Sequence, residues 1–335
     1  MSDGPLLDVR DLRVTFRTDG GDVTAVDGVS FTLGADEVLG IVGESGSGKS
    51  VTMMSVMRLV PERNTRFEGE VHYGGRDLMQ LSQRAMRQVR GSEIAMIFQD
   101  PMTSLNPVYR VGWQIAEQVR EHEGLSAAAA RDRAVELLRA VGIPDADQRV
   151  DDFPHHFSGG MRQRVMIAMA LSCRPRVLIA DEPTTALDVT IQAQILDLIR
   201  TLRRETGSSV VLITHDMGVV AEMADRVQVM YGGRVVEQGP TRAIFHDPLH
   251  PYTWGLLGSI ARLDRPRPRR LKAIGGAPQS ASETPTGCVF ADRCPYRFER
   301  CSEPPPLEAK RGPDHLDACH LPLEVRPSLR ERGAA

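Results

Sequence analysis

The chain of 335 residues lacks a long apolar run and lacks an excess of charge of one sign. No stretch approaches the roughly 18 consecutive apolar residues of a membrane-spanning helix, and Val165–Leu171 has the length of a core helix segment. Lys and Arg total 41 against 44 Asp and Glu, a net charge of -3, so nothing favours nucleic acid or acidic lipid as a partner. We expect a chain that does not cross a bilayer by itself and that binds no nucleic acid.

The N-terminal residues lack the features of a secretory signal peptide. Met1–Phe16 carry acidic residues where a signal peptide has a basic start and an apolar middle, which predicts a cytosolic, reducing location. With 41% hydrophobic and 25% charged residues, the composition is close to the globular average and argues against disorder, collagen and coiled coil. The length predicts about two domains.

The order of strand and helix patterns predicts an α/β fold. Residues 102–157 indicate an inserted helical subdomain, and the alternation of strands and helices elsewhere indicates a largely parallel core. The composition changes past Gly239, so we expect a domain over 1–240 and an extension over 241–335. Strands are expected at Leu7–Phe16, Val29–Leu33, Val38–Val42, Glu70–Tyr73, Val177–Ala180 and Val210–Thr214, a hairpin at Val227–Gln238, and helices from Gly48 to Pro61 and at Val111–His122, Ser126–Val141, Met161–Ser172, Ile191–Glu205 and Met217–Ala224.

A glycine-rich loop joins the apolar strand Val38–Val42 to the helix that begins at Gly48. Gly43–Ser50 reads GESGSGKS and fits the phosphate-loop pattern G-x-x-x-x-G-K-[ST] in the strand and helix context that this pattern requires. Glycines let backbone N–H groups approach phosphates, Lys49 supplies a cation, and Ser50 ligates Mg²⁺. The predicted ATP-binding residues are Phe16, Gly43, Glu44, Ser45, Gly46, Ser47, Gly48, Lys49, Ser50 and Val51.

A second strand ends in two carboxylates, where open α/β sheets place their ligands. Val177–Glu182 reads VLIADE. We expect Asp181 to hold Mg²⁺ through water and Glu182 to act as general base toward the attacking water.

The segment Phe157–Arg164 reads FSGGMRQR, and on it the chain resembles the ATPase subunits of ATP-binding cassette (ABC) transporters. The resemblance covers the first 240 residues and implies a P-loop NTPase cassette with a mixed sheet. It assigns Gln99 in IFQDP to sensing Mg²⁺ and the attacking water, His215 in LITHD to a switch role, and Lys49 and Glu182 to catalysis. Phe16 stands where the family stacks an aromatic ring on adenine, although a buried core phenylalanine is an equal alternative.

The same resemblance implies that two such subunits pair head to tail, with ATP between the phosphate loop of one and the signature of the other. The signature residues here are Ser158, Gly159, Gly160 and Met161, and Met161 departs from the glutamine that is usual at this position. Asp188, in Ala186-Leu187-Asp188, matches the dimer-contact loop. Ser158 and its glycines precede a helix, and such an anion site is useful only when the phosphate arrives from a partner.

Two further segments resemble the oligopeptide, dipeptide and nickel importer branch: QDPMTSLNP at Gln99–Pro107 and HPYTWGLL at His250–Leu257. The branch implies a second ABC ATPase, in a heterodimer, two membrane permeases and an extracytoplasmic peptide-binding protein. It places the chain peripherally, on the cytoplasmic face of the inner or plasma membrane. We expect an ATPase that energises peptide import; the alternatives are a nickel importer and an ABC ATPase acting on DNA or ribosomes.

Four cysteines lie near the C-terminus, in a proline-rich segment too small for a core of its own. They are Cys288, Cys294, Cys301 and Cys319, and together they suggest a metal that supplies folding energy. The resemblance favours a 4Fe-4S cluster. Zinc, with His315 or His320 as substitute ligands, and ordinary reduced thiols or a disulfide remain alternatives, because spacing does not fix the metal.

Overall fold

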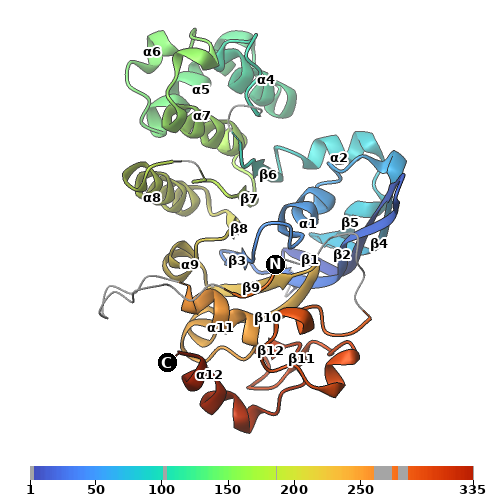
Figure 1. The fold of residues 1–335 in the computed structure, drawn as a ribbon. Helices are drawn as coiled ribbons and strands as arrows, with labels where there is room; N and C mark the ends of the chain where they lie inside the picture. Colours follow the sequence, from blue (N-terminus) through green and yellow to red (C-terminus); the bar gives the residue numbers. More distant parts are fainter. Residues whose placement is uncertain (1–3, 101–103, 186, 260–273, 278–285, 335) are drawn as a thin grey trace. The chain divides into compact units, whose positions relative to one another are not determined.

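The computed structural model describes residues 4–100, 104–185, 187–259, 274–277 and 286–334 (Figure 1). The chain divides into two compact units, which alternate along the sequence. The first unit comprises Met1–Leu33, Val38–Met79 and Thr214–Ala335, and the second comprises Gly34–Glu37 and Gln80–Ile213. Among the described helices, none combines the length and the apolarity that a bilayer span requires.

An antiparallel sheet opens the first unit. Its strand order is β2 (Gly21–Leu33), β1 (Leu7–Thr18), β4 (Thr65–Tyr73) and β5 (Arg76–Asp77). The alternating apolar residues of β1 are buried, and the register shifts after Val9, where Asp11 adopts a positive φ of 46°. The bulge preserves the burial of Leu12 and Val14 beyond it.

A second group of strands in this unit carries the start of the glycine-rich loop. β3 (Val38–Val42) is buried along its whole length and pairs in parallel with β9 (Arg226–Tyr231). β9 turns back through Gly232 and Gly233 into the antiparallel β10 (Arg234–Pro240), which is followed in the sheet by β12 (Leu316–Asp317) and β11 (Glu308–Ala309). A strand of a parallel sheet that is buried on both faces is expected to be apolar throughout, as β3 is.

Short helices complete the first unit. α1 follows β3 directly, and α10, α11 and α12 belong to the segment that Figure 1 draws in orange and red. Their bounds are α1 (Lys49–Val56), α9 (Met217–Met223), α10 (Thr241–His246), α11 (Pro251–Gly258) and α12 (Arg326–Ala334). One-turn helices occur at Glu62–Asn64, Leu78–Gln80, Ala291–Arg293, Glu299–Ser302 and Leu323–Val325.

The second unit combines three parallel strands with helices. The strand order is β8 (Ser209–Thr214), β7 (Val177–Asp181) and β6 (Ile94–Ile97), with every β7 residue buried. The helices are α2 (Gln83–Val89), α4 (Val111–Glu123), α5 (Ala127–Ala140), α6 (Ala146–Arg149), α7 (Gly159–Leu171) and α8 (Val189–Thr206), with a one-turn helix at Pro154–His156. α4, α5 and α6 lie within the stretch where the sequence indicates inserted helices.

The structure departs from the sequence predictions in identifiable places. The expected parallel core is confirmed by the pairs β3–β9, β6–β7 and β7–β8, but β1, β2, β4 and β5 form an antiparallel sheet that the alternation of strands and helices did not predict. The first helix ends at Val56 rather than near Pro61, since Arg58 takes a positive φ of 49°. β6 and α2 were missed, because a four-residue apolar run and a polar seven-residue helix carry little periodicity.

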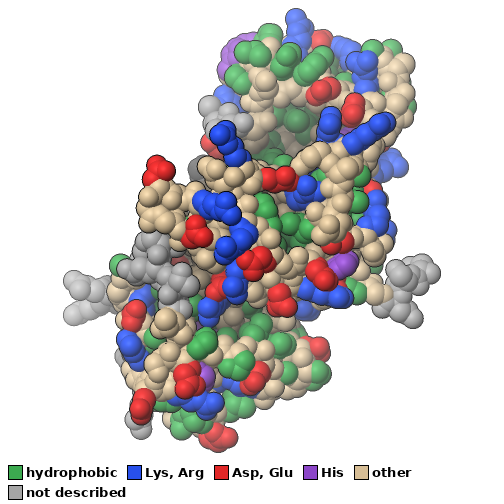
Figure 2. All heavy atoms as spheres, turned by 90° about the vertical axis from the view of Figure 1, so that its right-hand side faces the viewer, with side chains coloured by type: hydrophobic (Ala, Val, Ile, Leu, Met, Phe, Trp, Pro, Cys, Tyr) green, Lys and Arg blue, Asp and Glu red, His purple; other side chains and the backbone are tan. Residues whose placement is uncertain are grey.

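Charges of both signs share the surface. On the face that Figure 2 shows, the Lys and Arg side chains of the described residues are interspersed with Asp and Glu. This distribution accords with the small net charge of the sequence.

Candidate ATP-binding and hydrolysis site

The glycine-rich loop is shaped by close backbone contacts. Gly43, Gly46 and Gly48 have φ values of 155°, 79° and 95°, which disfavour other residues. A Cβ on Gly43 would lie 2.2 Å from the Met230 carbonyl oxygen, and one on Gly48 would lie 2.5 Å from that of Ala25. The loop is therefore packed against β2 and β9, and glycine is required at both contacts.

Lys49 is buried at the start of α1 and is held by the loop itself. Its Nζ donates to the carbonyl oxygens of Gly43 and Glu44 at 2.8 and 2.9 Å, and to Ser47 Oγ at 3.3 Å. Ser50, the next residue, is half-buried. A cation and a hydroxyl at a helix N-terminus, beside a loop of glycine N–H groups, form a site suited to a polyphosphate and its Mg²⁺.

Two residues of the C-terminal region contact Glu44 of this loop, and the sequence did not indicate either. The Glu44 N–H donates to Tyr252 Oη at 2.8 Å, and Arg293 Nη1 and Nη2 donate to the Glu44 carboxylate at 2.5 and 3.1 Å. Burial raises the pKa of Tyr252, and the hydrogen bond that Arg293 donates to Glu44 raises the pKa of Arg293 above its ordinary value. Tyr252 therefore stays neutral and Arg293 stays charged at neutral pH.

Phe16 lies in β1 and is half-buried, outside the fully buried core. Its neighbours across the sheet are Val23 on β2 and Thr65 on β4. A partly exposed ring leaves a face for adenine, so the stacking role stays a prediction.

In the second unit, the two carboxylates at the end of β7 differ in environment. Asp181 is buried, whereas Glu182 is half-buried and has a positive φ of 45°, a conformation that costs a non-glycine residue free energy. Gln99 Nε2 and Thr185 Oγ1 both donate to Glu182 Oε2, at 3.0 and 2.7 Å. The structure thus brings Gln99 to Glu182 and fixes the orientation of the predicted general base.

The predicted signature occupies the N-terminus of α7. Ser158 is the N-cap of this helix, and its Oγ accepts from the Met161 N–H at 3.3 Å. Gly159 and Gly160 open the helix, and a Cβ on Gly160 would lie 2.9 Å from Ile191 on α8. Ser158 and Gly159 are exposed. An exposed N-terminus with glycines is a site that an external phosphate can approach.

The remaining predicted residues lie in connecting segments. Asp188 caps α8, with Oδ1 accepting from the Ile191 N–H at 3.0 Å; Ala186 lies outside the described residues. His215 is exposed directly after β8, and Asp216 caps α9 beside it. Lys49, Ser50 and His215 belong to the first unit, and Gln99, Asp181, Glu182 and Ser158 to the second.

The four C-terminal cysteines are free thiols; Cys301 lies in the one-turn helix Glu299–Ser302, and the other three lie outside helices and strands. The Cys288 N–H donates to the Cys301 carbonyl oxygen at 3.0 Å, and Cys319 Sγ accepts from the Leu321 N–H at 3.5 Å. Burial raises the pKa of Cys294 to about 11 and that of Cys319 to about 12, and it also raises the pKa of Cys288. Within the described ranges, no three His, Cys, Asp or Glu side chains form a group able to hold a metal ion.

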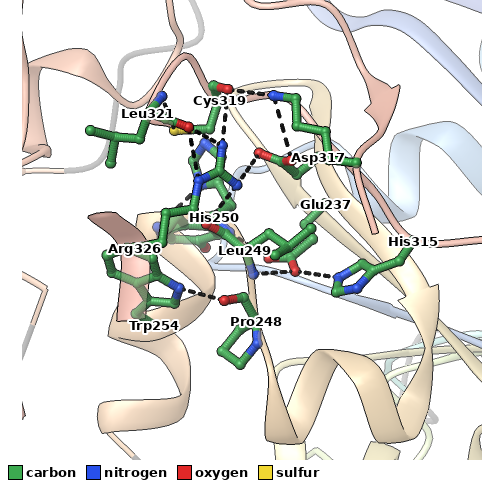
Figure 3. Close-up of polar contacts among 12 residues, drawn as sticks. Glu237, Pro248, Leu249, His250, Trp254, His315, Asp317, Cys319, Leu321 and Arg326 are labelled. Atoms are coloured by element: carbon green, nitrogen blue, oxygen red, sulfur yellow. Dashed lines mark hydrogen bonds and ion pairs between the residues drawn. The ribbon is translucent and has the colours of Figure 1, made fainter. Parts of the chain in front are cut away.

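Arg326 holds the segment that carries Cys319, as Figure 3 shows. This buried residue begins α12 and donates to the carbonyl oxygens of Cys319 and Leu321 and, at 2.9 Å, to Asp317 Oδ2. Lys310 Nζ also donates to the Cys319 carbonyl oxygen, at 2.5 Å. Burial raises the pKa of Asp317, against the opposing effect of Arg326 and Lys310. The backbone at Cys319 is therefore fixed by two cations.

A second buried carboxylate joins this segment to β10. Glu237 accepts the N–H groups of Leu249 and His250 at 2.6 and 2.9 Å, and its Oε1 lies 2.8 Å from His315 Nε2. His250 is fully buried, and this burial lowers its pKa to about 3. Its Nδ1 accepts from the Tyr252 N–H at 3.1 Å and caps α11. Neutral His250 thus begins the helix that carries Tyr252.

Comparison with known families matches two parts of the chain. Residues 26–185 match the family model described as ABC transporter, and residues 236–301 match that described as oligopeptide/dipeptide transporter, C-terminal region. The second match includes Tyr252 and Arg293, the residues that contact Glu44.

Related proteins and solved structures agree with these matches. The oligopeptide transport ATP-binding protein OppD of Salmonella typhimurium is 53% identical over 319 residues, 95% of this chain and 94% of that protein. OppD of Bacillus subtilis is 55% identical over 303 residues, 90% and 85% of the two chains. A dimeric, post-hydrolysis structure of the ATP-binding cassette MJ0796 bound to ADP and phosphate has a TM-score of 0.63 at 27% identity, and covers 70% of this chain and 99% of that one. On its sequence and its fold, this chain belongs to the ATP-binding cassette family of transporter ATPases, in the branch that carries the oligopeptide/dipeptide C-terminal region.

Proposed function

We propose that this chain is the ATP-hydrolysing subunit of a multi-subunit importer that brings oligopeptides or dipeptides across the cytoplasmic membrane. The observation that carries the proposal is the pair of hydrogen bonds that orients Glu182, from Gln99 and Thr185, in a chain that also holds Lys49 in a glycine-rich loop. The relatives are named for peptide transport, which favours peptides over nickel as cargo.

The residues fit a mechanism of water attack on the terminal phosphate of ATP. The N–H groups of the loop and Lys49 bind the phosphates, and Phe16 stacks on the adenine ring. Glu182 takes a proton from the attacking water, and Gln99 orients the carboxylate that does so. His215, after β8, contacts the terminal phosphate and reports its release.

Mg²⁺ accompanies ATP in this proposal. Hydroxyl, amide and carboxylate oxygens are the ligands that Mg²⁺ prefers, and Ser50, Gln99 and Asp181 supply one of each. Held by these residues, the ion would supply positive charge to the phosphate oxygens.

The exposed N-terminus of α7 implies a second ATPase subunit. Ser158, Gly159 and Gly160 would contact the ATP that is held by the phosphate loop of the partner, and Asp188 would contact the partner directly. We propose a heterodimer with a related ABC ATPase. Two membrane permeases and an extracytoplasmic peptide-binding protein complete the complex, which places this chain peripherally on the cytoplasmic face of the membrane.

We further propose that residues 1–240 form the nucleotide-binding domain and 241–335 an extension with a four-cysteine metal site. The ligands would be Cys288, Cys294, Cys301 and Cys319. Four sulfur donors suit a 4Fe-4S cluster, and zinc is the alternative. The four free thiols and the Leu321 N–H bond to Cys319 Sγ support the donor set, because such bonds stabilise bound thiolates. Burial raises the pKa values of Cys294 and Cys319, so the metal itself would have to displace their protons. The bound metal would fix the fold of the extension.

Purification of the tagged chain from its native membranes in mild detergent tests the proposal. We expect recovery of two multispanning subunits, a second cassette ATPase and an extracytoplasmic binding protein whose bound peptide identifies the cargo. Recovery of the chain alone, or with ribosomes or nucleic acid, would contradict the transport function.

A further inference from the structure

An ion pair ties the cysteine-bearing segment to the phosphate-binding loop. Arg293, one residue before Cys294, donates two hydrogen bonds to the carboxylate of Glu44, and its side chain is only 5% exposed. Both residues belong to the first unit although 249 positions separate them. The Glu44 side chain is 27% exposed, so the bidentate pair is partly buried and is screened less by solvent than a fully exposed pair.

The Arg293 guanidinium is itself fixed in place. Its Nε donates to the Gly275 carbonyl oxygen at 2.8 Å, and its Nη2 donates to that of Ile274 at 3.2 Å. The group also lies over the Tyr231 ring, 5.7 Å from the ring centroid. Arg293 therefore offers Glu44 a cation whose position is already determined by the C-terminal region.

A second contact reaches the backbone of the same loop residue. Tyr252 on α11 accepts the Glu44 N–H through Oη at 2.8 Å. Phe290, three residues before Arg293, packs against the rings of Tyr231 and Tyr252, with centroids 5.3 Å apart in both pairs. Side chain and backbone of Glu44 are thus held by one aromatic cluster and one arginine, all from the region beyond β8.

These contacts matter chemically because Glu44 is the second residue of GESGSGKS. A carboxylate beside a bound triphosphate repels it unless a cation neutralises the carboxylate. We infer that Arg293 and Tyr252 are positioning residues of the ATP site, through which the C-terminal region sets the affinity of the phosphate loop for Mg-ATP. The inference rests on the proposed function.

The test is calorimetric titration of the purified full chain with Mg-ATP. We expect Arg293→Ala to weaken binding about tenfold, because a carboxylate is left without its cation. Arg297→Ala is the matched control: Arg297 lies in the same segment but pairs with the exposed Asp292 at 2.7 Å, so its loss should change affinity less than about twofold. In the double variant Glu44→Gln, Arg293→Ala, most of the affinity should return, since the unpaired charge is gone.

Two outcomes overturn the inference. One is a dissociation constant for Arg293→Ala equal to that of the wild type; the other is a double variant that binds no better than Arg293→Ala, which would mean that Arg293 supports only the fold of the extension. If thermal unfolding shows that Arg293→Ala is misfolded, Tyr252→Phe is the alternative test. This variant keeps the packing of the ring and removes only the Oη acceptor, and it should weaken Mg-ATP binding a few-fold. A wild-type chain that binds no Mg-ATP would instead contradict the proposed function, and the inference with it.

Discussion

Gln99 donates a hydrogen bond from Nε2 to Oε2 of Glu182 at 3.0 Å, joining the second residue after β6 to the first residue after β7. The backbone of Glu182 is also in the left-handed conformation, with φ of 45°, which a glutamate adopts only when its surroundings enforce it. The carboxylate that would take a proton from water is therefore held in one direction by neighbouring groups of its own chain. Such presetting lowers the reorganisation that a catalytic step requires.

Gln99→Ala should lower the turnover number for ATP hydrolysis about tenfold, because Glu182 loses a donor that orients it. Affinity for Mg-ATP should change less than turnover. Single-turnover hydrolysis in the assembled transporter separates the two quantities. Thr185→Ser, which retains the hydroxyl donor to Glu182, is the control and should stay near the wild-type rate. Turnover unchanged in Gln99→Ala would show that this contact does not assist the reaction.

Ser158→Arg should reduce hydrolysis in the assembled transporter by about 100-fold, because it blocks the anion site at the N-terminus of α7. Binding of Mg-ATP to the isolated chain should be unaffected, since Ser158 would act on the nucleotide of the partner. Ser126→Arg is a matched control: Ser126 caps α5 with a bond of the same length, 3.3 Å, so the loss of a helix cap is equal. Equal loss of activity in both variants would refute the trans role of Ser158.

Anaerobically purified protein should contain iron and acid-labile sulfide, and Cys288→Ser and Cys319→Ser should each remove most of both. Cys173→Ser should retain them, because Cys173 lies outside the C-terminal segment and is half-buried after α7. Absence of both iron and sulfide in the wild type would eliminate the cluster, and zinc in their place would establish the alternative.

Stability should fall as the pH drops below about 6.5, partly because of His250. Its pKa is about 3 in the folded chain and about 6.5 when unfolded, so between these values only the unfolded state takes up the proton. The contribution of His250 to the free energy of unfolding is fully present above pH 6.5, and about 1.4 kcal/mol of it is lost for each pH unit below that value, down to about pH 3. Urea unfolding of wild type and His250→Asn at pH 7.5 and 5.5 measures this; asparagine retains a cap acceptor without titrating. An equal pH dependence in both proteins would contradict the assignment.

The phosphate loop and the acidic strand end were predictable because their signals are local. A fully apolar strand followed by GESGSGKS defines β3 and α1 within a few residues, and VLIADE defines β7. The orientation of Glu182 by Thr185 was not predictable, since it depends on a backbone conformation. Arg293 and Tyr252 were missed for a different reason: they meet Glu44 across 249 and 208 positions, and no local pattern specifies such a contact.

The most direct test of the account is peptide uptake and ATP hydrolysis by the complete transporter in proteoliposomes, with wild-type chain and with Glu182→Gln. The account predicts that hydrolysis and uptake occur together in the wild type, and that both fall by at least about 100-fold in Glu182→Gln while Mg-ATP still binds. Wild-type rates in Glu182→Gln, or peptide uptake that continues without hydrolysis, would contradict it.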